Sequence, residues 1–267
     1  MSEPTASRWR DDGFEPVDAC EVRPVRVLAA DSWLSHDGAA VALDAHRSRF
    51  LRSLPSDVDP TDVDAAAFWD AAIATVPRTG DWFPRLELRE VGERRELLLR
   101  MRPAPELRRD VALVTHEGPD PRARPLVKGP DLERLTAVRT TAQGRGAGDA
   151  VLLDAAGHVA ETATASLVWW RGDALCVPAD DVPHLPGVTL STLVVLATAL
   201  GVEVLHERVR PGDLDGFEIW TLNALHGIRI VTSWAGGPAP AAEPGRLTAW
   251  RRRLDALRRP LPGEAAA

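Results

Sequence analysis

Lysine is the charged residue that this sequence has least of. Lys128 is the only lysine among 267 residues, and arginine supplies the rest of the positive charge. Arginine matches lysine in charge, but it does not lose its proton to become an amine nucleophile. Keeping one lysine therefore indicates amine chemistry at that position. The alternative is a surface lysine that survived by chance in an arginine-biased composition.

Other scarcities narrow the class of protein. There is no tyrosine, and the two cysteines, Cys20 and Cys176, fit neither a disulfide framework nor a metal or redox spacing. No apolar run has the length of a membrane span, and the first residues lack the pattern of a secretory signal. A net charge of −7 without a concentrated basic face argues against a nucleic-acid partner. We expect a soluble cytoplasmic protein with no membrane partner and no metal site.

The first half of the chain has the pattern of a small α+β domain. Residues 1–23 are polar and interrupted by proline, so they are predicted to be a flexible N-terminal tail. Residues 24–116 are predicted to form the small domain. Its helices are expected from an N-cap at Asp44 to about residue 54 and from about residue 61 onward. Its strands are expected at residues 25–28, 39–43, 83–91, 96–101 and 110–115.

The second half is predicted to be a larger domain at residues 128–267. A proline-rich, charged linker at residues 117–127 is expected to precede it. Helices are predicted at residues 131–143, 189–200 and 247–257, with a turn or short helix at 211–214. Strands are predicted at 150–154, 158–161, 166–170, 174–177, 202–208, 218–222 and 227–233. The fold class is therefore α+β, or α/β in two domains.

Four segments carry the candidate chemistry. Glu161 follows Lys128 by 33 residues and comes just after a predicted hairpin turn. Residues 185–189 read Leu-Pro-Gly-Val-Thr and immediately precede a predicted helix, whose N-terminus suits an anion. Residues 44–50 place a histidine and two arginines on a predicted helix, and residues 220–228 read Trp-Thr-Leu-Asn-Ala-Leu-His-Gly-Ile.

In this order the segments resemble the fold-type IV pyridoxal-phosphate enzymes, the class IV aminotransferase family. That family includes branched-chain and D-amino-acid aminotransferases and aminodeoxychorismate lyase, and the resemblance covers about residues 31–231. It implies pyridoxal 5'-phosphate as cofactor, Lys128 as the Schiff-base lysine and proton shuttle, and Glu161 as the partner of the ring nitrogen. The cofactor phosphate would be held by Arg49, Val188, Thr189, Asn223 and Ala224.

The chain departs from the family pattern at two places. It has no tyrosine after the lysine, where branched-chain aminotransferases have one, and Ser166 stands where the family usually has asparagine. Ser166 is still expected beside the cofactor. The family's substrate loop has no clear counterpart. Ser32, Trp33, Arg100 and Arg102 are the substrate-facing candidates, because guanidinium groups bind carboxylates.

The resemblance implies a homodimeric enzyme that acts on an amino acid, or an amino-acid-like carboxylate, together with an oxo acid. Transamination needs a pocket that accepts two substrates in turn, whereas pyruvate elimination from aminodeoxychorismate needs only one. The missing tyrosine and the Asn-Ala-Leu run favour the lyase; the missing substrate loop weighs against its chorismate substrate. The third alternative is a non-catalytic relative that keeps only the fold.

Overall fold

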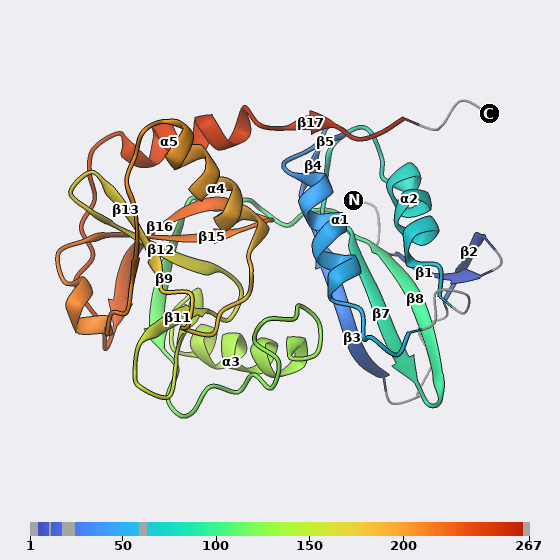
Figure 1. Ribbon diagram of the computed structural model, residues 1–267, viewed down its shortest axis with the longest axis horizontal. Helices are drawn as coiled ribbons and strands as arrows, with labels where there is room; N and C mark the ends of the chain where they lie inside the picture. The colour runs from blue at the N-terminus through green and yellow to red at the C-terminus, as the bar shows by residue number, and fades with distance from the viewer. Residues whose placement is uncertain (1–4, 11, 18–24, 59–62, 264–267) are drawn as a thin grey trace. The chain divides into compact units, whose positions relative to one another are not determined.

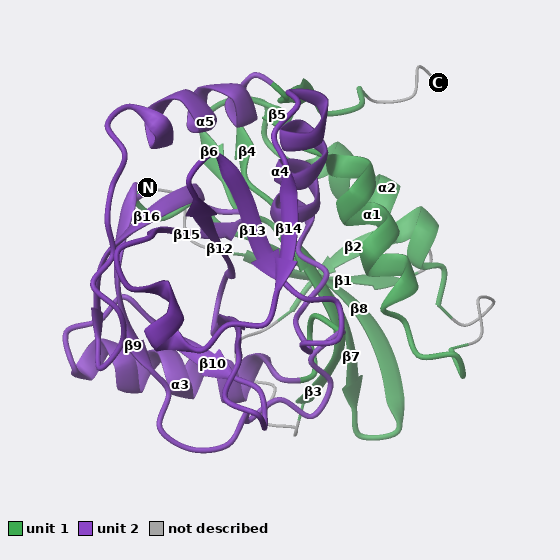
Figure 2. Cartoon of the chain, turned by 60° about the vertical axis from the view of Figure 1, so that its left-hand side comes forward, with its two compact units in different colours: residues 1–106, 127–130, 257–267 green, residues 107–126, 131–256 purple. Residues whose placement is uncertain are grey.

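The computed structural model describes residues 5–10, 12–17, 25–58 and 63–263. The chain forms two compact units (Figure 2): residues 1–106, 127–130 and 257–267 make unit 1, and residues 107–126 and 131–256 make unit 2. This grouping differs from the predicted division at the lysine. Residues 127–130 leave unit 2, pair with a strand of unit 1, and return, so Lys128 belongs to unit 1 instead of opening the larger domain.

Unit 1 is built on an antiparallel sheet with the strand order β2-β1-β8-β7-β3. Its strands are β1 Thr5–Arg10, β2 Gly13–Pro16, β3 Val25–Ser32, β7 Arg85–Val91 and β8 Arg94–Met101. A smaller sheet has the order β17-β5-β4-β6. It consists of β4 Ser35–His36, β5 Ala39–Ala40, β6 Asp81–Trp82 and β17 Arg259–Pro260.

Strands β1 and β2 correct the prediction of a flexible tail over residues 1–23. Trp9 and Phe14 have ring centroids 5.0 Å apart, and these rings lie 6.2 and 5.9 Å from Phe68. This aromatic burial gives the N-terminal hairpin its stability, and a polar average over the segment conceals it. Residues 1–4, 11 and 18–23 of the predicted tail lie outside the described residues.

Helices α1 Leu43–Arg52 and α2 Ala65–Thr75 pack on the sheet of unit 1 (Figure 1). Phe50 and Trp69 come from the helices and share the core with Leu86 and Leu88 of β7. The prediction of Asp44 as the N-cap of α1 was wrong. The cap is Ala42, in the left-handed region with φ 52°, which places Asp44 inside the first turn.

Helix α2 begins at Ala65, later than the predicted start, because Asp64 caps it. The carboxylate of Asp64 accepts hydrogen bonds from the backbone N–H groups of Ala66 and Ala67, at 3.1 and 2.8 Å. The predicted start near residue 61 lies outside the described residues.

Unit 2 contains a sheet that closes on itself. The order is β11-β10-β9-β16-β15-β12-β13-β14, and an additional pairing of β11 with β12 completes a ring. The strands are β9 Asp110–Thr115, β10 Asp149–Leu153, β11 Val159–Thr162, β12 Ser166–Arg171, β13 Ala174–Pro178, β14 Val204–Glu207, β15 Glu218–Asn223 and β16 Gly227–Ala235.

The helices of unit 2 match the predicted elements to within two residues. They are α3 Leu132–Gly144, α4 Val188–Ala199, α5 Arg246–Asp255 and the 3-10 helix η1 Pro211–Leu214. The predicted strands are likewise present, with ends shifted by one or two residues. Within the described part of the chain, no helix is both long enough and apolar enough to cross a membrane.

Candidate active site

The segment that carries Lys128 is fixed to strand β3 of unit 1. The backbone N–H of Ala30 donates to the carbonyl oxygen of Lys128 at 2.7 Å. The next residue, Gly129, has φ 137°, and a Cβ at this position would lie 2.8 Å from the Cα of Ala29. Only glycine permits so close an approach between the two backbones. The requirement for Gly129 therefore fixes the position of the lysine along β3.

A buried charged cluster lies on the same strand, one residue beyond Ala30. Asp31 is 0% exposed, and its carboxylate accepts hydrogen bonds from Nε and Nη2 of Arg49, both at 2.8 Å. Nδ1 of His46 lies 2.7 Å from the same carboxylate. Burial opposes ionisation of Asp31, but the charges of His46 and Arg49 outweigh it and lower its pKa to about 2.

This cluster bears on the predicted phosphate-binding residue of α1. Arg49 is buried and held by a two-point contact with Asp31, so its guanidinium position is set by β3. Burial lowers the pKa of His46, and the positive charges of Arg49 and Lys128 act in the same direction. Arg49 was predicted from the sequence, but its partners Asp31 and His46 were not. His46 lies three residues before Arg49, in the same segment of residues 44–50.

The predicted substrate residues Ser32 and Trp33 lie in different surroundings in unit 1. Ser32, Arg85 and Arg100 lie opposite one another across β3, β7 and β8 and therefore share a face. Trp33 points elsewhere: it is 1% exposed, belongs to the core, and packs on Trp69 with ring centroids 4.9 Å apart. A substrate-facing role for Trp33 does not fit this position, because the ring is enclosed by the helices.

Three arginines gather near one buried carboxylate on the Ser32 face. Arg85 and Arg100 both form ion pairs with Glu87, at 3.2 Å for Arg100. Arg102 donates from Nε to the carbonyl of Phe83 at 3.1 Å. Burial lowers the pKa of Arg102 to about 10, and the charge of Arg85 adds to the effect. Three guanidinium groups therefore lie around the Glu87 carboxylate.

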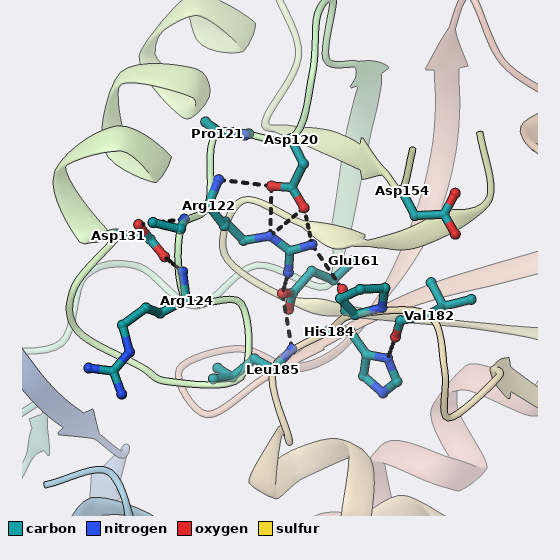
Figure 3. Close-up of polar contacts among 12 residues, drawn as sticks. Asp120, Pro121, Arg122, Arg124, Asp131, Asp154, Glu161, Val182, His184 and Leu185 are labelled. Carbon is teal, nitrogen blue, oxygen red and sulfur yellow. Dashed lines mark hydrogen bonds and ion pairs between the residues drawn. The ribbon is translucent and has the colours of Figure 1, made fainter. Parts of the chain in front are cut away.

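In unit 2, the carboxylate of Glu161 is held from two sides (Figure 3). Its Oε1 accepts hydrogen bonds from Nη1 of Arg122 and from the backbone N–H of Leu185, at 3.1 Å for the latter. Arg122 is in turn fixed by the carboxylate of Asp120, at 2.6 Å from Nη2, and by the carbonyl of Pro183 at 2.9 Å. The predicted partner of the ring nitrogen is thus a buried, oriented carboxylate.

The loop that presents Arg122 is shaped by a second aspartate. Asp131, just before α3, accepts hydrogen bonds from the backbone N–H groups of Ala123 and Arg124 at 3.0 and 2.8 Å (Figure 3). The sequence predicted a linker at residues 117–127 and a helix from Asp131, and no role was predicted for Asp120, Arg122 or Asp131. The alternation of acidic and basic residues between prolines was the available signal, but it did not reveal which charge would reach Glu161.

Ser166 lies directly opposite Glu161 where β11 and β12 close the ring. It also touches the turn before α4: a Cβ at Gly187 would lie 2.6 Å from Oγ of Ser166. Gly187 caps α4, and no described side chain caps the backbone N–H groups of its first turn, which includes Val188 and Thr189. The helix N-terminus therefore lies beside the Glu161–Ser166 pair.

The predicted Asn223–Ala224 contact has a different arrangement. The side-chain oxygen of Asn223 accepts hydrogen bonds from the N–H groups of Leu225 and His226, at 3.2 and 2.8 Å. Its amide nitrogen lies 3.4 Å from the carbonyl of Thr164. The Asn223 side chain thus forms the turn between β15 and β16, and the half-buried Ala224 lies at its tip.

Unit 2 has groups that suit the two charged parts of a pyridine cofactor, its protonated ring nitrogen and its phosphate. A buried carboxylate suits a protonated ring nitrogen, and a helix N-terminus without a side-chain cap suits a phosphate. The missing Cβ at Gly187 keeps the approach to that N-terminus open beside Ser166. In the described residues, no group of three or more histidine, cysteine, aspartate or glutamate side chains has the geometry to hold a metal ion.

Comparison with known proteins agrees with this fit. The sequence profile of the family "Amino-transferase class IV" matches residues 29–234, most of the chain. The chain therefore belongs to the class IV aminotransferase family. Pyridoxal 5'-phosphate is the cofactor of that family.

Similar proteins point to the same fold. A probable branched-chain-amino-acid aminotransferase of Rickettsia bellii is 34% identical over 76 residues, which is 28% of this chain and 26% of that protein. The match thus spans about a quarter of the relative's length. One similar solved structure is that of branched-chain aminotransferase from Thermoproteus uzoniensis with norvaline. Its sequence is 16% identical to this chain, and its TM-score is 0.78 over 97% of this chain and all of that one.

A putative 4-amino-4-deoxychorismate lyase from Legionella pneumophila also has this fold. It is 17% identical, with a TM-score of 0.72 over 93% of this chain and 98% of that one. At these identities the likeness establishes the fold-type IV architecture, which confirms the predicted fold class. An aminotransferase and a lyase match it about equally well.

Proposed function

We propose that this protein is a pyridoxal-phosphate-dependent aminotransferase that acts on an amino acid or an amino-acid-like carboxylate through Lys128. The observation that carries the proposal is the Glu161 carboxylate, buried and oriented by Arg122 and Leu185 beside the N-terminus of α4. Arg122 offsets the cost of burying this carboxylate and leaves it ionised and oriented, as a partner of a cationic group must be. A protonated pyridine nitrogen is such a group, and family membership supplies it.

Each predicted residue then has a defined task. When bound, the cofactor supplies a ring that accepts the electrons released at the substrate's α-carbon. The amine of Lys128 attaches the cofactor and moves the α-proton at its Nζ. Glu161 keeps the proton on the ring nitrogen. Backbone N–H groups of Val188 and Thr189, the turn at Ala224, and Arg49 would neutralise the phosphate.

The arginine-rich face of unit 1 supports a carboxylate substrate. Arg85, Arg100 and Arg102 gather around the carboxylate of Glu87 there, and Ser32 adds a hydroxyl group. The carbonyl of Lys128 accepts a hydrogen bond from the backbone of Ala30, so the Lys128 segment lies beside the strand that carries Ser32. Guanidinium groups bind carboxylates at two points, which orients a substrate as well as attracting it.

Cofactor binding tests the proposal that this protein is a pyridoxal-phosphate enzyme. The purified chain should bind pyridoxal phosphate and turn yellow, and borohydride should fix the cofactor's mass to the peptide that contains Lys128. The Lys128→Arg variant keeps the charge and is the matched control; it should bind cofactor only reversibly. A wild-type chain that takes up no cofactor would support the non-catalytic relative instead.

Aminodeoxychorismate lyase is the second candidate. The chain has no tyrosine to follow the lysine, and Asn223 shapes a turn with the Asn-Ala-Leu sequence. Incubation with aminodeoxychorismate, and separately with pairs of amino acid and 2-oxo acid, separates the two. Pyruvate release without an amino acceptor favours the lyase, and a new amino acid favours the aminotransferase.

The proposal includes a cytoplasmic homodimer, as the resemblance to the family implies. The low cysteine content supports a reducing compartment, since Cys176 is buried as a free thiol. Light scattering coupled to gel filtration measures the mass directly. A monomer at working concentrations would rule out the dimer without affecting the cofactor assignment.

A further inference from the structure

Residues 162–165 form the tight turn that joins β11 to β12 in unit 2. The backbone N–H of Thr162 donates to the carbonyl of Ala165 at 2.7 Å, and the N–H of Ala165 donates to Oγ1 of Thr162 at 2.9 Å. The N–H of Thr164 lies 3.4 Å from the same hydroxyl oxygen. The backbone and the side chain of Thr162 therefore close the turn together.

A buried aspartate at the start of β10 holds this turn. Asp149 is 0% exposed, and its Oδ2 accepts hydrogen bonds from the hydroxyl groups of Thr162, at 2.8 Å, and Thr164. Its Oδ1 accepts from the backbone N–H of Ala150 at 2.9 Å. Burying a carboxylate is costly without hydrogen bonds, and both hydroxyl donors that offset the cost come from the turn. The carboxylate and the turn thus stabilise each other.

The turn also sets the position of Glu161, the proposed partner of the ring nitrogen. Within the described residues, the register of β11 with β12 consists of the pair Glu161–Ser166, which flanks the turn on its two sides. On β10, the strand that Asp149 begins, Glu161 pairs with Leu152. Asp149 therefore ties the turn on one side of Glu161 to the strand on its other side.

The same turn reaches the residues predicted to hold the cofactor phosphate. The side-chain amide of Asn223 donates to the carbonyl of Thr164 at 3.4 Å. Ser166, directly after the turn, pairs with Leu222, the residue before Asn223. One buried carboxylate is thus connected, through residues 162–165, to predicted residues for both the ring nitrogen and the phosphate.

Asp149 acts on Glu161 through the backbone. Neighbouring residues on a strand face opposite ways, so the side chains of Glu161 and Thr162 lie on different faces of β11. The hydroxyl group of Thr162 meets Asp149, whereas the carboxylate of Glu161 meets Arg122. Asp149 is therefore placed to fix the position of Glu161 without touching its carboxylate.

We propose that Asp149 is a positioning residue, which sets Glu161 and Asn223 together for the cofactor by fixing the turn at residues 162–165. The inference rests on the proposed function, because it assigns Asp149 a role in that same site. Closing the turn needs no buried charge, since Thr162 closes it with its own backbone and hydroxyl group. What the carboxylate adds is the tie between the turn and β10.

Asparagine in place of Asp149 tests this role in the full chain. It keeps the side-chain volume, but its single oxygen cannot replace both carboxylate oxygens as acceptors. Asp149→Asn should bind pyridoxal phosphate about tenfold more weakly, as measured by quenching of tryptophan fluorescence. It should also move the pH midpoint of the bound cofactor's visible absorption, because Glu161 governs the proton on the ring nitrogen.

Asp154→Asn is the matched control. Asp154 follows β10 at its other end, and its carboxylate accepts hydrogen bonds from the backbone N–H groups of Ala156 and His158, both at 2.8 Å. It therefore also holds a turn, but not the one beside Ser166 and Asn223. Both variants should unfold at a lower urea concentration than wild type. Asp154→Asn should nevertheless keep the wild-type cofactor affinity and absorption titration.

Thr164 gives an independent test from the other side of the contact. Thr164→Val keeps the shape of the side chain without its hydroxyl group and should weaken cofactor binding about threefold. Thr164→Ser keeps the hydroxyl group and should bind as wild type does. In the double variant Asp149→Asn/Thr164→Val the losses should be less than additive, because both changes remove the same contact.

Wild-type affinity together with an unchanged titration in Asp149→Asn would overturn the inference, and so would equal changes in Asp154→Asn. If Asp149→Asn does not fold, the two Thr164 variants decide, and equal affinities of Thr164→Val and Thr164→Ser count against the role. These outcomes leave the proposed function intact. A wild-type chain that takes up no cofactor would instead remove the proposed function, and the role of Asp149 with it.

Discussion

The guanidinium group of Arg122 is bonded to Asp120 and to Glu161 at once, so a loop residue sets the orientation of a buried strand carboxylate. Burial opposes the charged form of Arg122, but hydrogen bonds with the two carboxylates raise its pKa. The two carboxylates thus stabilise the charged form of Arg122. In the proposed enzyme, Arg122 positions Glu161 toward the ring nitrogen.

Replacing Arg122 by methionine should lower kcat/KM about tenfold or more, because an unheld carboxylate no longer meets the cofactor in one orientation. The visible absorption of the bound cofactor should change its pH dependence as well, since Glu161 governs the proton on the ring. Arg124→Met, on the exposed side of the same loop, is the control. Equal behaviour of the two variants in both measurements would show that Arg122 has no positioning role.

Alanine at Gly187 should destabilise the protein by about 1–3 kcal/mol and weaken cofactor binding, because its Cβ would collide with Oγ of Ser166. Removing that oxygen should restore the space. The double variant Gly187→Ala/Ser166→Ala is therefore expected to recover most of the lost free energy of unfolding, measured by urea denaturation. Additive losses in the two single variants would mean that the two sites do not interact.

Alanine at Gly129 should be more damaging than alanine at Gly144. The first position has φ 137° and almost touches the backbone of Ala29, whereas the second is the open end of α3. We expect Gly129→Ala to cost about 1–3 kcal/mol and to reduce covalent capture of the cofactor by Lys128. Gly144→Ala should change neither property. Thermal unfolding and borohydride labelling report the two effects independently.

Asp31 should make the stability of the protein sensitive to acid. Its pKa is about 2 in the folded chain, below the ordinary value of 3.8, so folding favours the ionised form. The resulting stabilisation, about 2 kcal/mol, is fully present above pH 4 and is lost as the pH falls toward 2. Asp31→Asn should flatten this part of the pH profile. A variant that keeps the wild-type slope between pH 4 and 2 would assign the acid sensitivity to other groups.

Much of the fold could be predicted from local sequence. Alternating apolar residues identified β7 and β8, and the apolar run after Gly187 identified α4, because these patterns arise from burial against one core. The N-terminal hairpin was missed because its stability comes from Trp9 and Phe14 packing on Phe68, 54 residues beyond Phe14. The cap of α1 was misplaced because Ala42 adopts a conformation for which alanine has no intrinsic preference.

The candidate site likewise contains residues that the sequence predicted and residues that it did not. Lys128, Glu161 and the turn before α4 were predicted from their order and spacing along the chain, and their roles stay predictions. The partners Asp31 and Arg122 could not be predicted, because each reaches its target through the fold: Asp31 across to α1, and Arg122 from a loop to β11. The burial of Trp33, just past the end of β3, could not be predicted either, because it depends on packing against Trp69 of α2.

Residues 127–130 limit how unit 1 can be expressed or exchanged as a separate fragment. Unit 1 needs the carbonyl of Lys128 on β3, and Leu261 in its core, although both come after the whole of residues 1–106. A fragment that ends at Glu106 would therefore lack pieces of its own interior. The smaller half of this protein cannot be exchanged as a contiguous cassette, and a transplant between relatives must carry three separate stretches of sequence together.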